Sequence, residues 1–95
     1  MLKIHRKILE EFKDVNAKVI LFGSLVKGNY RLDSDIDIAI ITNKKSEREK
    51  ARKIADEVLL KYGKVVSLKF ILEEDFNKKN PFIEEIKKGK VITYG

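Results

Sequence analysis

The alternation of helical and extended segments constrains the fold of this 95-residue chain more than any other feature. Apolar residues recur at helical spacing over residues 2–13, whereas residues 17–22 form a continuous apolar run typical of a buried strand. Further strands are predicted over 35–41, rich in Ile, over 64–72, and at a short edge segment, 91–94. Helical segments separate most of these strands. The order predicts an α/β (α+β) fold, in which a small mixed sheet of three or four strands carries helices packed mainly on one face.

Two helix starts carry local signals. Residues 46–49, Ser-Glu-Arg-Glu, form a capping box, which predicts that a helix begins there and continues to Gly63. Asn80 and Pro81 predict the start of the last helix, with Asn as the cap and Pro in the first turn, and Gly89 as its end. The connection through the helix after residue 46 is long enough for a parallel crossover. The connection between the first two strands is shorter, so that pair is predicted to be antiparallel.

Length and composition predict one domain spanning residues 1–95, placed in the cytoplasm. There is no Cys, which excludes disulfides and thiolate metal sites, and no apolar run reaches the roughly 20 residues that span a bilayer. The net charge of +6 suits a polyanionic ligand or an acidic partner, but Lys is mixed with Glu along the whole chain. Nucleic-acid binding is therefore not expected. The single histidine, His5, is predicted to be a surface or boundary residue of the first helix.

Two carboxylates, Asp35 and Asp37, stand at the head of the Ile-rich strand. Because side chains alternate across a strand, both carboxylates are predicted to project from the same face. Two like charges so close repel each other unless a cation lies between them, and Mg²⁺ (or Mn²⁺) bridging to a triphosphate would serve. The alternative is that both acids are simply solvated on an exposed face. The pair of aspartates by itself favours neither interpretation over the other.

A second candidate element is the turn Gly23-Ser24, which follows an apolar strand and precedes a short helix ending near Gly28. Gly lets a phosphate approach the backbone closely, and the first amides of a helix together with the Ser hydroxyl can donate to an anion. Lys27, one turn along, could meet a phosphate as a point charge. The alternatives are an ordinary helix cap and a solvated lysine.

Together, the two elements are far more specific. Residues 23–28, Gly-Ser-Leu-Val-Lys-Gly, and residues 34–40, Ser-Asp-Ile-Asp-Ile-Ala-Ile, closely resemble the signature of the polymerase-beta-type nucleotidyltransferase superfamily. Within it, the chain looks like the minimal nucleotidyltransferase (MNT) group. The resemblance implies the nucleotidyltransferase fold, with Gly23 and Ser24 binding phosphates and Asp35 and Asp37 as catalytic metal ligands.

The resemblance also implies an activity and partners. The expected reaction is metal-dependent transfer of a nucleoside monophosphate, AMP from ATP above all, to a hydroxyl of a protein or a small molecule. Some members of the group act as antitoxins beside a HEPN-type toxin, so a HEPN-type partner protein is one expectation and a homodimer is another. In either case the nucleoside triphosphate is the expected small-molecule ligand.

The chain departs from the family pattern at the third carboxylate. Active relatives carry an acid on the next core strand, but residues 65–71 contain none, so Ser67 or Lys69 takes that place. Residues 73–75 are acidic but look like the first turn of a helix, and they are not expected to reach the site. The alternative function is therefore a catalytically weakened relative that binds a nucleotide or a partner.

Overall fold

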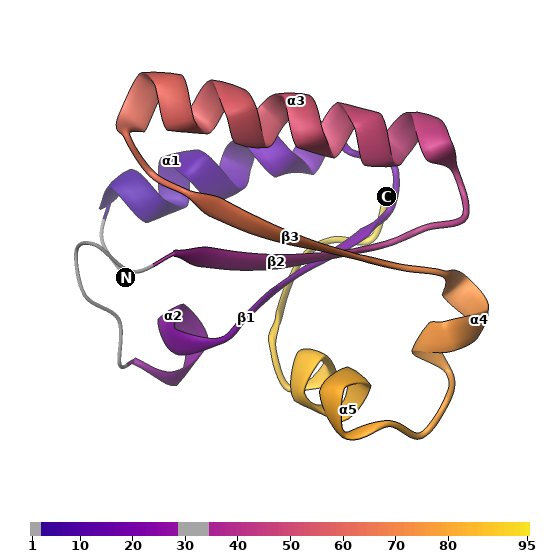
Figure 1. The fold of residues 1–95 in the computed structure, drawn as a ribbon. Helices are drawn as coiled ribbons and strands as arrows, with labels where there is room; N and C mark the ends of the chain where they lie inside the picture. The colour runs from indigo at the N-terminus through magenta and orange to yellow at the C-terminus, as the bar shows by residue number, and fades with distance from the viewer. Residues whose placement is uncertain (1–2, 29–34) are drawn as a thin grey trace.

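A four-stranded mixed sheet organises the computed structural model, which describes residues 3–28 and 35–95. Figure 1 labels its elements along the chain. They are α1 (Lys3–Glu11), the 3₁₀-helix η1 (Phe12–Asp14), β1 (Lys18–Phe22), α2 (Ser24–Lys27), β2 (Ile36–Ile41), α3 (Lys45–Tyr62), β3 (Val66–Ile71), α4 (Glu73–Phe76), α5 (Pro81–Lys87) and β4 (Lys90–Thr93).

The strand order is β3-β2-β1-β4, so the two strands that carry the predicted motifs lie side by side in the middle of the sheet. Strand β1 is antiparallel to both β2 and β4, and β2 is parallel to β3. The 18-residue helix α3 makes the parallel crossover. The predicted mixed sheet and both predicted strand directions are confirmed, and β4 is an edge strand as expected.

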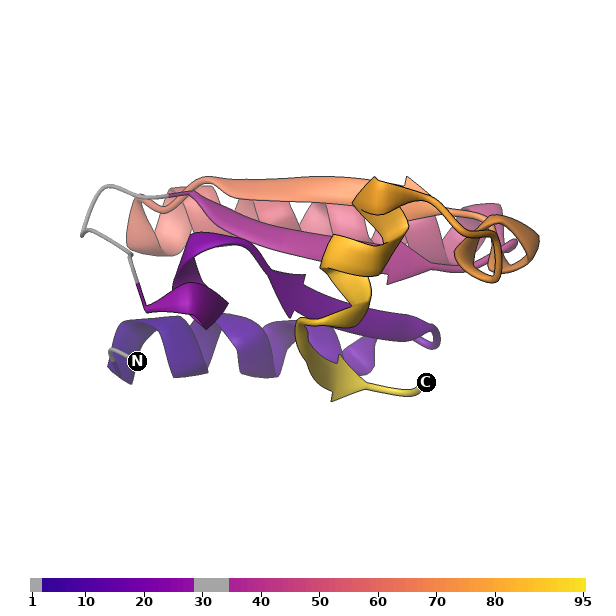
Figure 2. The same cartoon turned by 90° about the horizontal axis from the view of Figure 1, so that it is seen from below.

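The two faces of the sheet bury different side chains of the same strands. Ile36, Ile38 and Ile40 of β2 pack in a core beneath α1 and α3, the two longest helices of the described chain. Ala39 and Ile41 point to the other face, where α5 covers part of the sheet with Ile83 and Ile86 among its buried residues. Figure 1 shows α1 and α3 together above the sheet and α5 below it, and Figure 2 gives the view from below, with α5 in front. The expectation that helices pack mainly on one face of the sheet therefore holds for the two long helices, α1 and α3, but not for α5.

The two predicted helix starts differ in outcome. Asn80 caps α5 as predicted, since its Oδ1 accepts a hydrogen bond of 2.8 Å from the amide of Phe82. The capping box at residues 46–49 is wrong, because α3 begins at Lys45 and no side chain caps it. Glu47, in the first turn, accepts a hydrogen bond of 2.6 Å from the backbone amide of Asn16, which ties the helix to the segment before β1.

The prediction for His5 is also wrong: the side chain is only 1% exposed. It lies on the inner side of α1 with Ile8 and Leu9, because residues three and four apart share a helix face. Burial and the positive charge of Lys64 both lower the pKa of the His5 imidazole. None of the helices described here is long and apolar enough to cross a membrane.

Candidate active site

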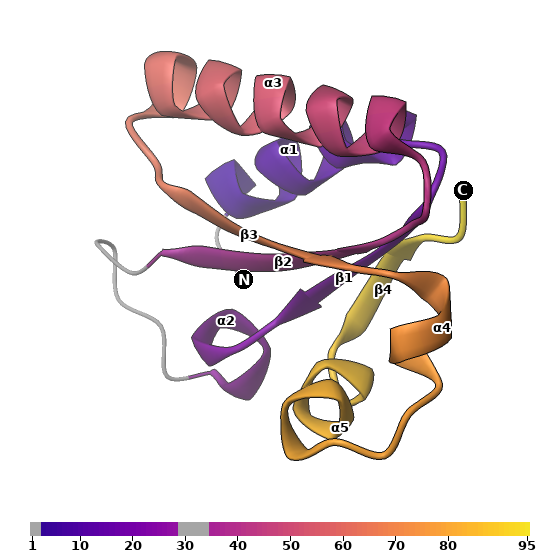
Figure 3. The ribbon, with the colours of Figure 1, turned by 45° about the vertical axis from the view of Figure 1, so that its right-hand side comes forward.

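The two predicted motifs meet at one end of the central strand pair. Strand β1 runs into Gly23, and β2 begins just after Asp35. Because these strands are antiparallel, the end of β1 lies beside the start of β2, and Phe22 pairs with Asp37. Figure 3 shows α2 lying at this end of the sheet, where β1 ends and β2 begins. Ser34, the first residue of the second motif, lies outside the described residues.

The Gly23 backbone and the Asp37 carboxylate are in close contact. Gly23 has φ 81° and ψ −151°, a conformation that is essentially restricted to glycine. A Cβ at this position would overlap with Oδ2 of Asp37 and would lie 3.1 Å from its Cγ. Two features therefore require glycine at this position: the backbone angles, and the space that the Asp37 carboxylate occupies.

Helix α2 begins immediately at this contact. Its first residue, Ser24, is half-buried, and the amides of Val26 and Lys27 both donate to the Gly23 carbonyl at 3.2 Å. The two amides before these, of Ser24 and Leu25, lie at the start of the helix, where amides lack an acceptor within the helix and are suited to an anion. Gly28 closes the helix with φ 77°, as predicted for its end. The turn thus places potential anion donors next to the acids of β2.

Asp37 is half-buried and Asp35 is exposed. Burial raises the pKa of the Asp37 carboxyl, the negative charge of Asp35 raises it further, and the positive charge of Lys69 opposes both effects. The electrostatic environment therefore disfavours the charged form of Asp37 in the absence of a cation. A divalent cation shared by two carboxylate oxygens would relieve this repulsion.

Of the two residues expected in the place of a third carboxylate, Ser67 is the one that lies opposite Asp37. In the parallel register, Asp37 pairs with Ser67 and Ala39 pairs with Lys69, so Lys69 lies one row farther along the same face. Within the described chain Lys69 forms no ion pair with Asp37. No group of three or more acidic, His or Cys side chains suited to a metal occurs among residues 3–28 and 35–95.

The acidic segment after β3 lies at the far end of the sheet, as predicted. Glu73 begins α4, beyond the carboxyl ends of β2 and β3. Its Oε2 accepts a hydrogen bond of 2.8 Å from the Asn43 amide, and the Glu73 backbone amide donates to Asn43 Oδ1 at 3.1 Å. Glu73 therefore fixes the turn after β2 and does not face Asp37.

Lys27 forms an ion pair with Glu85 of α5. The hydrogen bond from the Lys27 ammonium lowers the pKa of the Glu85 carboxyl. Between α2 and α5 lies a hollow of about 160 Å³, which Gly23, Lys88 and Gly89 also line. Sequence reasoning missed Glu85 and Lys88, since nothing distinguishes them from other charged residues on a helix surface.

A family model described as a nucleotidyltransferase domain matches residues 2–93 of the chain. A relative from Methanocaldococcus jannaschii named "Putative protein adenylyltransferase MJ0604" is 42% identical over 62 residues, which cover 65% of this chain and 60% of that protein. "Putative protein adenylyltransferase MJ0141" of the same organism is 36% identical over 72 residues, which cover 64% of this chain and 73% of the relative. The chain thus spans less than two thirds of the length of the first relative.

Two solved structures share the fold. A toxin-antitoxin crystallised with AMP-PNP superposes with a TM-score of 0.58 at 17% identity, over 99% of this chain and 75% of that chain. A mutant of the toxin-antitoxin MntA-HpeT gives a TM-score of 0.59 at 15% identity, with the same coverage of 99% and 75%. At these identities the likeness concerns the arrangement of helices and strands.

Proposed function

The chain belongs to the nucleotidyltransferase domain family, and on that premise we propose that it transfers a nucleoside monophosphate, AMP from ATP, to a hydroxyl of an acceptor. The observation that carries the proposal is the contact between the Gly23 backbone and the Asp37 carboxylate. It places a turn suited to phosphates beside an acid pair suited to a cation. These are the two components that transfer of a nucleotidyl group requires.

In this proposal Gly23 and Ser24 hold the phosphates of the nucleotide. The close approach of the chain at Gly23 and the amides at the start of α2 support this role. Lys27 contributes positive charge at the edge of the site. Its pairing with Glu85 means that a phosphate would have to compete with a carboxylate that already neutralises the ammonium.

Asp35 and Asp37 are the proposed metal ligands. Members of this family generally use divalent metal ions. The described residues fit such an ion, because Mg²⁺ is held by one or two carboxylates together with substrate phosphates and retains several waters. When bound, the ion would neutralise charge on the reacting phosphate. Mn²⁺ would satisfy the same oxygen ligands.

The bond changes follow from the chemistry of the transfer. The acceptor oxygen forms a bond to the α-phosphorus of ATP, the bond from that phosphorus to the bridging oxygen breaks, and pyrophosphate leaves. The acceptor hydroxyl must also lose its proton. Ser67 lies opposite Asp37, where a carboxylate could have taken it, so the proton passes to one of the two aspartates or to water.

This same feature supports a second candidate function. With Ser67 opposite Asp37, the chain would bind a nucleotide or a partner protein but turn over slowly or not at all. A general base contributes about 10²–10⁴-fold to a rate, so its loss could leave binding intact while nearly abolishing transfer.

Of the possible acceptors, we favour a protein over a small molecule. The curated relatives are named as protein adenylyltransferases, and the structures of like fold are toxin-antitoxin pairs, one of them crystallised with AMP-PNP. The proposed acceptor is accordingly a hydroxyl side chain of a partner protein, and a HEPN-type toxin is the candidate to test first.

Substitution of both aspartates tests the site. We expect Asp35→Asn with Asp37→Asn to weaken Mg²⁺-dependent ATP binding at least about tenfold, because both proposed metal ligands lose their charge. The measurement is isothermal titration calorimetry with ATP, with and without Mg²⁺. The control, Asp14→Asn with Asp56→Asn, removes the same charge from exposed positions on η1 and α3. Equal ATP affinity in both double variants would disprove the assignment.

Substitution of Ser67 separates the two functions. If the missing acid limits turnover, Ser67→Asp should raise the rate of label transfer from [α-³²P]ATP to an acceptor by about 10²-fold or more. The control, Ser67→Asn, adds a similar volume without a base. If the wild type already transfers AMP rapidly and Ser67→Asp does not accelerate it, the weakened-relative alternative is excluded. If neither protein transfers label although both bind ATP, the chain is a binding module.

A further inference from the structure

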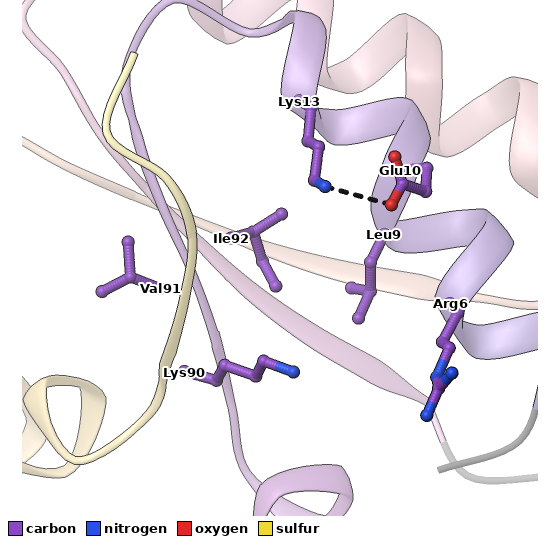
Figure 4. A pocket seen from close by; sticks show the side chains of 7 residues that line it. All are labelled: Arg6, Leu9, Glu10, Lys13, Lys90, Val91 and Ile92. Atoms are coloured by element: carbon purple, nitrogen blue, oxygen red, sulfur yellow. Dashed lines mark hydrogen bonds and ion pairs between the residues drawn. The ribbon is translucent and has the colours of Figure 1, made fainter.

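A groove of about 350 Å³ lies between α1 and β4, away from the acid pair. Figure 4 shows the side chains around it: Leu9 and Ile92 form an apolar floor, and charged residues from both elements form the rim. Leu9 is buried and Ile92 is half-buried, so the floor is continuous with the core beneath α1. None of the described residues that line the groove is aromatic.

The rim of the groove is basic. Arg6 and Lys13 contribute from α1 and Lys90 from β4, against one acid, Glu10. Glu10 is already bonded to the Lys13 ammonium at 3.0 Å, as the dashed line in Figure 4 marks. Arg6 and Lys90 form no ion pair with any part of the chain that the structure describes. Two cations without a partner in the described structure therefore stand on opposite sides of an apolar floor.

One side of the groove is the edge of the sheet. In the strand order β3-β2-β1-β4, strand β4 pairs with β1 alone. An edge strand presents backbone amides and carbonyls that a further extended segment can bond, and this is a common way for a peptide to bind a sheet.

We propose that this groove binds an extended, acidic segment of a partner protein. The segment lies beside β4, its carboxylates meet Arg6 and Lys90, and its aliphatic side chains rest on Leu9 and Ile92. A peptide fits these features better than a nucleic acid does, because none of the described residues that line the groove offers a ring for bases to stack on, whereas the apolar floor suits aliphatic side chains. The proposal does not depend on nucleotidyl transfer, since none of these residues belongs to the proposed site.

The groove is nevertheless close to that site along the chain. Lys90 directly follows Gly89, which lines the hollow beside Gly23. A partner held along β4 would therefore end next to the turn proposed to bind phosphates.

The test uses a fluorescein-labelled peptide of alternating Glu and Val, titrated by fluorescence anisotropy. The comparison probes are a peptide of alternating Lys and Val and an oligothymidylate that carries the same number of charges as the acidic peptide. We expect the acidic peptide to bind best and its affinity to fall with added salt.

We expect Arg6→Glu with Lys90→Glu to weaken its binding about tenfold or more. The matched control, Lys53→Glu with Lys79→Glu, makes the same charge change at exposed positions elsewhere and should leave binding within about twofold of wild type.

A second measurement needs no substitution. In ¹⁵N chemical-shift mapping on the unmodified protein, the acidic peptide should shift the amides of Val91 and Ile92 and leave those of β3 unchanged. The proposal is overturned if no peptide binding is detected, if both charge-reversal variants bind equally, or if the oligothymidylate binds more tightly than the acidic peptide. Asp35→Asn with Asp37→Asn should not alter peptide binding, so failure of the catalytic proposal and failure of the docking proposal give different results.

Discussion

At the scale of single residues, Gly23 determines whether the two motifs can meet. Its φ of 81° and ψ of −151° turn the chain from β1 into α2, and its missing side chain leaves room for the Asp37 carboxylate. Sequence reasoning predicted a close approach at this glycine, but to a phosphate. The structure adds a second reason for the glycine, which is the acid on the neighbouring strand.

Substitution of Gly23 should therefore lower the free energy of unfolding more than substitution of another glycine with positive φ. We expect Gly23→Ala to lower the free energy of unfolding by at least about 2 kcal/mol and to displace Asp37. Gly28→Ala is the control, because φ is also positive there (77°) but no described atom lies within 4 Å of the added Cβ, so about 1 kcal/mol is expected. Urea denaturation measures both. Similar losses for the two variants would show that the contact with Asp37 has no energetic consequence.

His5 shows how one buried titratable group couples stability to pH. Its folded pKa lies below the ordinary value of 6.5, first because of burial and then because of Lys64. The unfolded state therefore binds more protons than the folded state between the two pKa values. Stability is fully present above the unfolded pKa and is lost as the pH falls below it.

Replacing the only histidine should remove this pH dependence. The wild type is expected to lose thermal stability between about pH 7.5 and about pH 5, and His5→Leu should lose less over the same interval. The measurement is the midpoint of thermal unfolding by circular dichroism at both pH values. Lys64→Gln serves as a partial control, because it removes the secondary cause and leaves the burial. A wild type and a His5→Leu variant with parallel pH profiles would contradict the assignment.

At the scale of elements, the two predicted helix starts show that a good local pattern is sometimes followed by the folded structure and sometimes not. The Asn80 cap is local, because its acceptor and donor are only two residues apart in the chain. The capping box at residues 46–49 has an equally good local pattern. The helix nevertheless begins one residue ahead of the box, without a side-chain cap, and Glu47 within the pattern accepts a hydrogen bond from the backbone of Asn16, 31 residues earlier.

The Asn80 cap should be worth a measurable part of the stability. Asn80→Ala is expected to cost about 1 kcal/mol, because one donor of the first turn of α5 loses its acceptor. Lys79→Ala, at the exposed neighbouring position, should change the free energy of unfolding by less than about 0.5 kcal/mol. Both are measured by chemical denaturation. An Asn80→Ala variant as stable as Lys79→Ala would mean that the cap bond contributes nothing to α5.

The pairing of β2 with β3 decides which residue of β3 lies opposite Asp37. The residues of β3 leave Ser67 and Lys69 as alternatives, because both point to the same face of a strand. The parallel register places Ser67 opposite Asp37 and moves Lys69 one row away. A one-residue slip would turn the hydrophobic side chains of β3 to the wrong face, so packing holds this register in place.

At the scale of the whole molecule, the sheet order brings together charges that the chain keeps far apart. Lys27 meets Glu85 across the hollow beside Gly23, and Arg6 faces Lys90 across the groove next to β4. Charges mixed evenly along the sequence do not indicate a basic surface. The basic rim exists because α1 and an edge strand from the other end of the chain lie side by side.

The sequence alone predicted the order of the elements and the two motifs, because both depend on local residue patterns. It also predicted which strand pair is antiparallel and which is parallel, because the length of the connection limits the strand direction. The burial of His5, the partner of Glu47, the position of Ser67 and the groove at β4 required the tertiary structure. These features depend on which elements pack together and in what register, and such long-range contacts leave no local pattern in the residues that make them.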